Sequence, residues 1–257
     1  MRSEIAADVV FLAHGRTEFT RASFAALVRN TDWALVRNLV VYTDGLPLPL
    51  GLLMEEGPPS TAAVDTSLYG GPVAVMNAYL AGASRSAVWA KVDNDTIVPP
   101  CWLNAALSVM ERNPGLDLLG IEPWQSRTPA PWRHGHRGPE PERHSTEDDL
   151  RRGWVPCDAI GGLGMIRSAC FDGRSPMKPH SVYGGFTDWQ LREHAVVKGW
   201  IVPPLHLFLL DRLLAEPWAS LRRSHVAAGG ARPWTLYSEA EQKILAGWWL
   251  QVKTNGV

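Results

Sequence analysis

The sequence predicts an α/β fold in which helices flank a mostly parallel central sheet, and three observations lead to this prediction. Short apolar runs alternate with helical patterns in the first half of the chain. Each of these apolar runs ends at a polar turn. The length of 257 residues and the hydrophobic content of 46% allow one large domain with a sizeable core.

The first half of the chain contains three predicted strands. They are the apolar runs at residues 9–13, 39–42 and 87–92. Helical spacing of apolar residues covers residues 19–28 and 72–81, and the Pro- and Gly-rich residues 46–60 predict a surface loop. Strands joined through a helix run parallel with right-handed crossovers. We therefore expect the carboxyl ends of the three strands to meet at one edge of the sheet.

The second half is less regular. A helix is expected at residues 102–112, and strands at residues 116–121 and 159–167. Residues 125–152 are rich in Pro, Arg, His and acidic residues, which predicts a long loop. Two capping boxes, Thr187–Gln190 and Ser238–Glu241, predict helices that end at Lys198, before Gly199, and near Lys253.

Composition narrows the class of protein. A formal net charge of -1 excludes strong attraction of the whole molecule to nucleic acid or membrane, although a local basic face is compatible with it. The start of the chain has no signal-peptide pattern, and the apolar stretch Trp200–Leu210 is too short and too interrupted by proline to span a bilayer. Three cysteines without a CxxC pair argue against a disulfide framework or zinc site, so we expect a reducing, cytoplasmic location.

Two acidic residues follow the third predicted strand. Asp93 and Asp95, in the segment Lys91-Val-Asp-Asn-Asp95, are two residues apart and can share one divalent cation. Hard carboxylate oxygens suit Mg²⁺ or Mn²⁺. In open α/β sheets, ligands bind beyond the carboxyl ends of the strands, and His14 and Asp44 also follow strand ends. The alternative is a plain polar turn.

Six segments together resemble the family-two glycosyltransferases of the GT-A fold, including phage and bacterial members. They are VVFLAHGRTEFTRASFAALV, VVYTDG, GGPVAVMNAYLAG, VWAKVDNDTIVPPCWL, DAIGGLGMIRSACF and YGGFTDWQLREHAVVKGW, and they fall within residues 8–211. The chain departs from the family at three points. Leu46 replaces the usual Ser after Asp-Gly, Thr187-Asp188 offers one carboxylate instead of two, and His206 follows two prolines.

The resemblance implies one domain, residues 1–257, with distinct halves. Residues 1–97 or so would bind the nucleotide sugar, residues 98–211 the acceptor, and residues 212–257 would form a C-terminal helical extension. The implied donor-binding residues are Ala13, His14, Arg16, Asp44, Asn77, Lys91 and Asp93. The implied ligands of a Mn²⁺ or Mg²⁺ cofactor are Asp93, Asp95 and His206, with Asp95 as the direct carboxylate ligand.

The resemblance also implies the reaction: a metal-dependent, inverting transfer of a sugar, most simply from a UDP-sugar, to an acceptor hydroxyl. Asp188 would act as general base, with Gly161, Gly162 and Trp189 beside the acceptor. Each role has a structural alternative. Asp188 could simply stabilise the start of a helix, and His206 could be a satisfied, partly buried histidine.

The sequence says least about which molecule accepts the sugar. Residues 125–154 hold six arginines and three histidines, and a second basic cluster consists of Arg212, Arg222, Arg223, His225 and Arg232. These regions could bind the phosphate backbone of DNA. One hypothesis is therefore transfer of the sugar to a flipped-out hydroxymethylated pyrimidine in phage DNA, which would take place in the host cytoplasm. Five acids in the first region could instead pair with its arginines. The competing acceptors are a cell-surface glycan, a lipid-linked sugar or a small molecule.

Two other functional classes compete with a glycosyltransferase. A nucleotidyltransferase should carry a Gly-rich basic loop after its first strand, and His14-Gly15-Arg16 is too short for one. A non-catalytic nucleotide-sugar-binding protein would use Asp93 and Asp95 to hold a structural cation. It would bind the donor without turnover.

Overall fold

A computed structural model describes the chain over ten stretches. They are residues 6–13, 17–43, 61–65, 72–82, 85–121, 146–156, 162–173, 194–201, 208–210 and 220. The predicted loop at residues 46–60 and the predicted helix after Ser238 lie outside the described residues.

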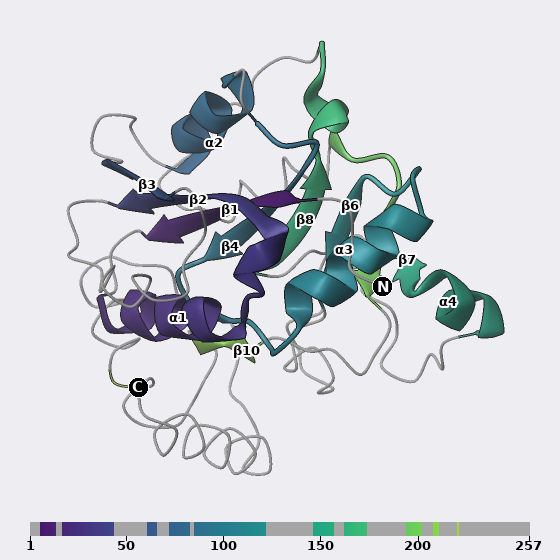
Figure 1. The fold of residues 1–257 in the computed structure, drawn as a ribbon, viewed down its shortest axis with the longest axis horizontal. Helices are drawn as coiled ribbons and strands as arrows, with labels where there is room; N and C mark the ends of the chain where they lie inside the picture. Colours follow the sequence, from purple (N-terminus) through teal and green to yellow (C-terminus); the bar gives the residue numbers. More distant parts are fainter. Residues whose placement is uncertain are drawn as a thin grey trace.

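An eight-stranded mixed sheet forms the centre of the molecule (Figure 1). Its strand order is β3-β2-β1-β4-β8-β6-β9-β7. The strands are β1 (Ala7–Ala13), β2 (Val36–Thr43), β3 (Thr61–Asp65), β4 (Val88–Asp93), β6 (Leu118–Gly120), β7 (Trp154–Pro156), β8 (Leu163–Arg167) and β9 (Lys198–Ile201). The first four in spatial order run parallel, β8 is antiparallel to both neighbours, and β9 is parallel to β6 and antiparallel to β7. The predicted α/β class with a mostly parallel sheet is confirmed.

A second, two-stranded sheet lies beside the first. It pairs β5 (Thr96–Ile97) with β10 (Phe208–Leu209) in antiparallel fashion. β5 begins just after β4 ends, so this small sheet holds the segment that follows the central strand.

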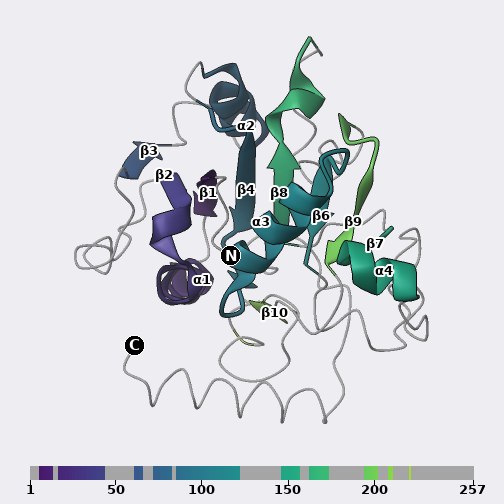
Figure 2. The same ribbon diagram turned by 45° about the vertical axis from the view of Figure 1, so that its right-hand side comes forward.

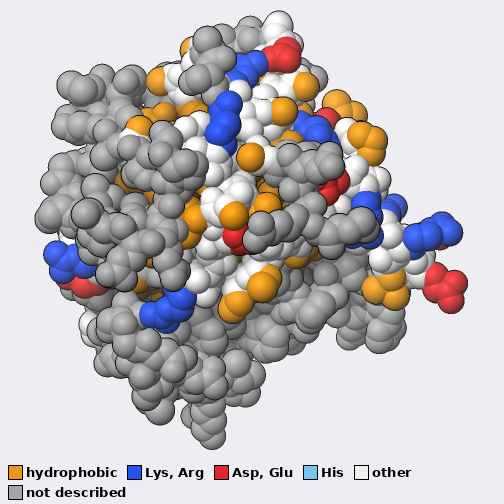
Figure 3. Space-filling model, viewed as in Figure 1, with side chains coloured by type: hydrophobic (Ala, Val, Ile, Leu, Met, Phe, Trp, Pro, Cys, Tyr) orange, Lys and Arg blue, Asp and Glu red, His pale blue; other side chains and the backbone are white. Residues whose placement is uncertain are grey.

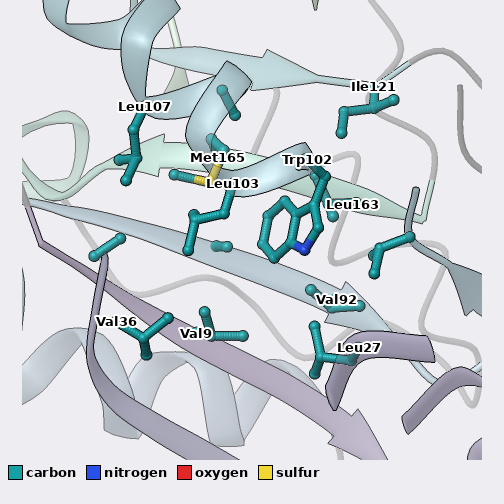
Figure 4. Packing of buried hydrophobic residues seen from close by; sticks show 14 of the residues in the cluster. Val9, Leu27, Val36, Val92, Trp102, Leu103, Leu107, Ile121, Leu163 and Met165 are labelled. Carbon is teal, nitrogen blue, oxygen red and sulfur yellow. The ribbon is translucent and has the colours of Figure 1, made fainter. Parts of the chain in front are cut away.

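Helices cover both faces of the large sheet (Figure 2). The helices are α1 (Thr17–Asn30), α2 (Pro72–Ala81), α3 (Trp102–Arg112) and α4 (Glu147–Arg152). Phe24 and Leu27 of α1 share one apolar cluster with Leu103 and Leu107 of α3, which packs on the first face of the sheet (Figure 4). Residues of α2, including Met76, belong to a separate cluster on the second face.

Alternation along the strands creates these two faces. Val9 and Phe11 of β1 enter the first cluster, whereas Val10 and Leu12 enter the second. Successive side chains of a strand point to opposite faces, and a strand covered on both sides reads as a continuous apolar run. This explains why residues 9–13 are recognisable as a strand from the sequence.

Two helix predictions are confirmed at both ends, and two predictions in the second half need correction. Helices α2 and α3 have the predicted bounds. The last part of the predicted loop forms α4, because Thr146 and Asp149 make a capping box and Gly153 ends the helix with a positive φ of 83°. The helix predicted to end at Lys198 ends earlier, since Lys198 begins β9.

The start of β9 is fixed by a carboxylate. The backbone N–H groups of Val196 and Val197 donate to Oδ2 of Asp117, at 2.8 and 2.9 Å. Beyond them, β9 pairs with β6 and β7. Because of these long-range hydrogen bonds, this segment does not continue the helix that the sequence predicts.

A buried carboxylate ties the amino ends of the strands together. Asp8 of β1 accepts hydrogen bonds from Arg37 at 3.0 and 2.8 Å, Asn38 at 2.9 Å, the Tyr79 hydroxyl at 2.8 Å and the Ser86 N–H at 3.0 Å. Burial raises the pKa of Asp8, but these hydrogen bonds outweigh it, so the net pKa lies below the usual 3.8. The same burial, together with the charge of Asp8, raises the pKa of Tyr79.

We predict that Asp8→Asn destabilises the fold in a pH-dependent way. Removing one partner of a buried network leaves donors unpaired, so the free energy of unfolding at neutral pH should fall by about 3 kcal/mol. Because the folded-state pKa is lowered, the carboxylate contributes fully above about pH 3.8 and its contribution is lost as the pH falls through the folded-state value. Urea unfolding from pH 7 to pH 3 measures this difference.

The matched control is Asp172→Asn, which removes an ion pair with Arg85 in which the Asp172 side chain is 62% exposed. It should cost about 0–1 kcal/mol. A cost for Asp8→Asn that stays constant with pH would contradict the assigned ionisation.

Candidate functional site

The carboxyl ends of three parallel strands meet at one edge of the sheet. Ala13 of β1 pairs with Thr43 of β2, and Leu12 of β1 pairs with Asp93 of β4. The expected convergence of the strand ends is thus present. His14, Arg16 and Asp44, which follow these strand ends in the sequence, lie outside the described residues.

The turn that follows β4 is held by helix α1. The Oγ of Ser23 donates to the carbonyl of Thr96 at 2.6 Å and lies 3.1 Å from the carbonyl oxygen of Asp93. The side-chain amide of Asn94 donates to Oγ1 of Thr20 at 3.0 Å. Buried polar groups need such partners, so α1 determines the path of the backbone between Asp93 and Thr96.

The strand after the turn is held from the other side. The N–H of Leu210 donates to the carbonyl of Asp95 at 2.8 Å, and Oγ1 of Thr96 donates to the carbonyl of Gly162 at 3.1 Å. The N–H of Asp93 also donates to the Gly162 carbonyl, at 2.9 Å. The acidic turn is therefore a constrained segment clamped between α1, β10 and the start of β8.

Lys91 and Asp93 form an ion pair at the end of β4. The Nζ of Lys91 lies 2.7 Å from Oδ1 and 2.8 Å from Oδ2 of Asp93. The Lys91 side chain is 1% exposed and that of Asp93 is 28% exposed. A buried ammonium requires a counter-ion. Lys91 thus orients the Asp93 carboxylate and places a positive charge within the site.

The side chains of the turn supply some, but not all, of the ligands that a hard divalent cation needs. Asp93 and Asp95 supply two carboxylates, and Mg²⁺ commonly binds through one or two carboxylates plus substrate phosphates. Among the described residues, no group of three or more His, Cys, Asp or Glu side chains is placed to hold a metal. The third predicted ligand, His206, lies outside the described residues. Lys91 engages both oxygens of Asp93, and Asp95 is buried. The assignment of Asp95 as the direct ligand stays a prediction.

Gly162 is packed against the turn. A Cβ built on Gly162 would overlap Oγ1 of Thr96 and lie 2.7 Å from Cδ2 of Leu209. The close approach that the structure records at this glycine is to the protein's own chain. Contact of Gly162 with an acceptor stays a prediction, and Gly161, Asp188 and Trp189 lie outside the described residues.

Three further candidates have defined positions. Ala13 is fully buried in the first apolar cluster, so its contact with a donor stays a prediction. Asn77 lies half-buried on α2. Asp172, a second carboxylate that could serve as a base, pairs with Arg85 before the start of β4, at the strand end opposite Asp93.

Sequence reasoning did not identify Thr20 and Ser23 as site residues. They are three positions apart on α1 and both are buried. Residues at this spacing share one helix face. Two polar residues on the face that α1 turns to the core are the signal that could have found them.

No protein-family model matches the chain, and no curated protein matches it either. Solved structures resemble its fold. S. aureus TarS 1-349 in complex with UDP-GlcNAc superposes with a TM-score of 0.55 at 12% identity, covering 84% of this chain and 61% of that chain. GalNAc-T7 with UDP, GalNAc and Mn²⁺ superposes with a TM-score of 0.52 at 12% identity, covering 80% of this chain and 43% of that chain.

The fold is GT-A. In this GT-A fold the acidic turn after β4 lies at the edge where the parallel strands end. The chain spans less than two thirds of the length of either of these structures. Within the described residues, no helix combines the length and the apolar character needed to cross a bilayer.

We predict that Gly162→Ala loosens the acidic turn. The added methyl group must displace Thr96 or Leu209, which should cost about 1–3 kcal/mol of stability. Adding Thr96→Ala removes the overlapping oxygen, so the double variant should be more stable than the sum of the two single effects predicts. Urea unfolding of the four proteins measures this coupling, and strictly additive effects would argue against the contact.

Proposed function

We propose that the chain is a glycosyltransferase, similar to family-two enzymes, that moves a sugar from a nucleotide-diphosphate donor to an acceptor hydroxyl. The observation that carries the proposal is the clamped acidic turn of Asp93 and Asp95 at the edge where the parallel strands of a GT-A sheet end. TarS in complex with UDP-GlcNAc and GalNAc-T7 with UDP, GalNAc and Mn²⁺ support a UDP-sugar as the donor.

The nucleotide in this proposal binds across the ends of β1 and β2. The groups assigned to it are the backbone of Ala13 together with His14, Arg16 and Asp44. Asn77 and Lys91 are assigned to the diphosphate. The ammonium of Lys91 is neutralised by Asp93 in the structure, so its assignment to the diphosphate rests on the family resemblance.

The proposed cofactor is Mn²⁺ or Mg²⁺, held by Asp93, Asp95 and His206. When bound, such a cation stabilises the negative charge that the diphosphate gains as the sugar leaves. Asp95 is assigned as the direct carboxylate ligand. Asp93 is assigned the task of orienting Lys91 and the water shell of the cation.

The proposed transfer is a single inverting displacement. The acceptor oxygen forms a bond to the anomeric carbon, the bond from that carbon to the diphosphate oxygen breaks, and its electron pair leaves with the diphosphate. The acceptor proton passes to the carboxylate of Asp188. An alcohol is a weak nucleophile at neutral pH, so a positioned base accelerates this step. Gly161, Gly162 and Trp189 are assigned to the acceptor side.

Two classes of acceptor follow from different observations. The two basic regions of the sequence support a 5-hydroxymethylated pyrimidine in phage DNA. The described part of the first region favours a glycan, a lipid-linked sugar or a small molecule instead. Arg151 pairs with Asp148 and Arg152 pairs with Asp149, so these arginines are neutralised within α4. Basic and acidic side chains accordingly lie together at the right-hand edge of Figure 3.

We predict that UDP-sugars with Mn²⁺ raise the melting temperature of the wild-type protein. A ligand present at a hundred times its dissociation constant adds about 2.7 kcal/mol to the stability of the folded state. Asp95→Asn should lose the Mn²⁺-dependent part of the shift, whereas Asp172→Asn should keep it. A metal-dependent shift that survives Asp95→Asn would contradict the assigned ligand.

We predict that Asp188→Asn keeps donor affinity and loses transfer by about 10²- to 10⁴-fold, because only the proton acceptor is removed. The assay follows labelled sugar onto 5-hydroxymethylcytosine duplex DNA, cell-surface glycans and small alcohols. Undiminished transfer by this variant would exclude Asp188 as the base. Donor binding without transfer to any acceptor, in the wild type, would indicate a non-catalytic nucleotide-sugar-binding protein.

A further inference from the structure

One row of residues crosses the second face of the large sheet next to the site. Strand pairing places its members side by side on β1, β4, β8, β6 and β9: Val10, Lys91, Gly164, Gly120 and Trp200. Directly paired residues of neighbouring strands point to the same face of a sheet. This row contains the buried lysine of the acidic site at one position and a tryptophan at another.

Only one member of this row, Val10, belongs to the apolar cluster of the second face. The preceding row runs from Asp8 through Trp89, Ile166 and Leu118 to Lys198, and its three central members all belong to the second apolar cluster. In the next row, the positions between Lys91 and Trp200 carry only the glycines Gly164 and Gly120. A glycine inside a strand weakens it and often marks a place where a ligand or another backbone comes close.

The spacing of the row suits a ring-sized group. Lys91 and Trp200 stand on strands that are three strand spacings apart, which is roughly 14 Å. The two positions between them, Gly164 and Gly120, carry no side chain, and both are buried. Lys91, with Asp93, marks the end of the row assigned to the diphosphate.

Trp200 supplies an unused hydrogen-bond donor. It is 5% exposed, and its indole N–H is buried without a hydrogen-bond partner in the described part of the protein. A buried donor is costly unless a partner is present. Sugar rings carry hydroxyl oxygens that accept such hydrogen bonds, and an indole offers both an apolar face and a polar N–H.

We propose that Gly164 and Gly120 form the floor, and Trp200 the far wall, of the subsite that receives the sugar ring of the donor. The indole N–H of Trp200 donates to a ring hydroxyl, and the glycines admit the ring because they lack a Cβ. The inference rests on the proposed glycosyltransferase function. It makes Trp200 and the two glycines the residues that set which sugar the protein accepts.

The test compares the binding of UDP with that of UDP-glucose and UDP-GlcNAc, by calorimetry in the presence of Mn²⁺. Trp200→Phe removes the N–H and keeps an aromatic ring, so it should weaken the better-bound UDP-sugar by about 5- to 10-fold and leave UDP affinity unchanged. Gly164→Ala adds a methyl group to the floor and should weaken the UDP-sugar at least as much, again without affecting UDP.

Matched controls separate the subsite from general packing. Trp89→Phe removes another buried indole N–H that has no hydrogen-bond partner among the described residues, but one row away from the glycines. Gly115→Ala adds a methyl group that meets no described atom within 4 Å. Both controls should bind UDP and the UDP-sugars as the wild type does, and thermal unfolding establishes that each variant is folded.

The outcomes distinguish the two proposals. A wild type that binds neither UDP nor any UDP-sugar overturns the proposed function itself. A wild type that binds them, with Trp200→Phe and Gly164→Ala unchanged, overturns the subsite alone. Equal weakening of UDP and UDP-sugar also overturns it, because the residues would then act only through the structure. If Trp200→Phe does not fold, Gly164→Ala alone decides the matter.

Discussion

The ion pair between Lys91 and Asp93 is the constraint around which the site is arranged. An ammonium with 1% exposure needs a counter-ion, and Asp93 provides both carboxylate oxygens at 2.7 and 2.8 Å. This pairing holds Asp93 at the end of β4 and directs the chain into the turn that Asn94 and Asp95 complete. The acidic segment that is proposed to bind a cation is therefore held in place by the positively charged side chain of Lys91.

The turn gains its rigidity from elements far away in the sequence. Ser23 and Thr20 come from α1, Gly162 precedes β8, and Leu210 follows β10. Ser23 and the Gly162 carbonyl each make two contacts with the turn, and Thr20 and Leu210 each make one hydrogen bond to it. A plain polar turn on a surface would not need this many buried partners, which is why the arrangement favours a functional role for the two carboxylates.

The two ends of the parallel strands have different tasks. At the amino ends, Asp8 gathers five hydrogen bonds and joins β1, β2 and α2 into one unit. Every one of those donors is satisfied within the protein, so this edge stabilises the fold. At the carboxyl ends the polar groups are clamped yet partly accessible, with the Asp93 side chain 28% exposed. The edge at the amino ends therefore stabilises the fold, and the edge at the carboxyl ends carries the candidate site.

The parts of the fold that could be read from the sequence are those with a strong local pattern. Residues 72–81 and 102–112 follow the helical period, and residues 9–13 form a buried apolar run. Strands of only two or three residues, such as β5, β7 and β10, carry too few side chains to show a period. The helix predicted to end at Lys198, before Gly199, is wrong at that end, because pairing with β6 and β7 makes Lys198 the first residue of a strand.

Taken alone, the sequence determined the α/β class, the three parallel strands of the first half and the acidic turn after the third, because these depend on the order of residues within a few positions. Only the tertiary structure decided that Lys91 is buried against Asp93, that Gly162 fits against Thr96, and that Gly164 and Gly120 lie between Lys91 and Trp200. The physical reason is that strand pairing joins segments distant in the chain. No local pattern specifies which of them become neighbours.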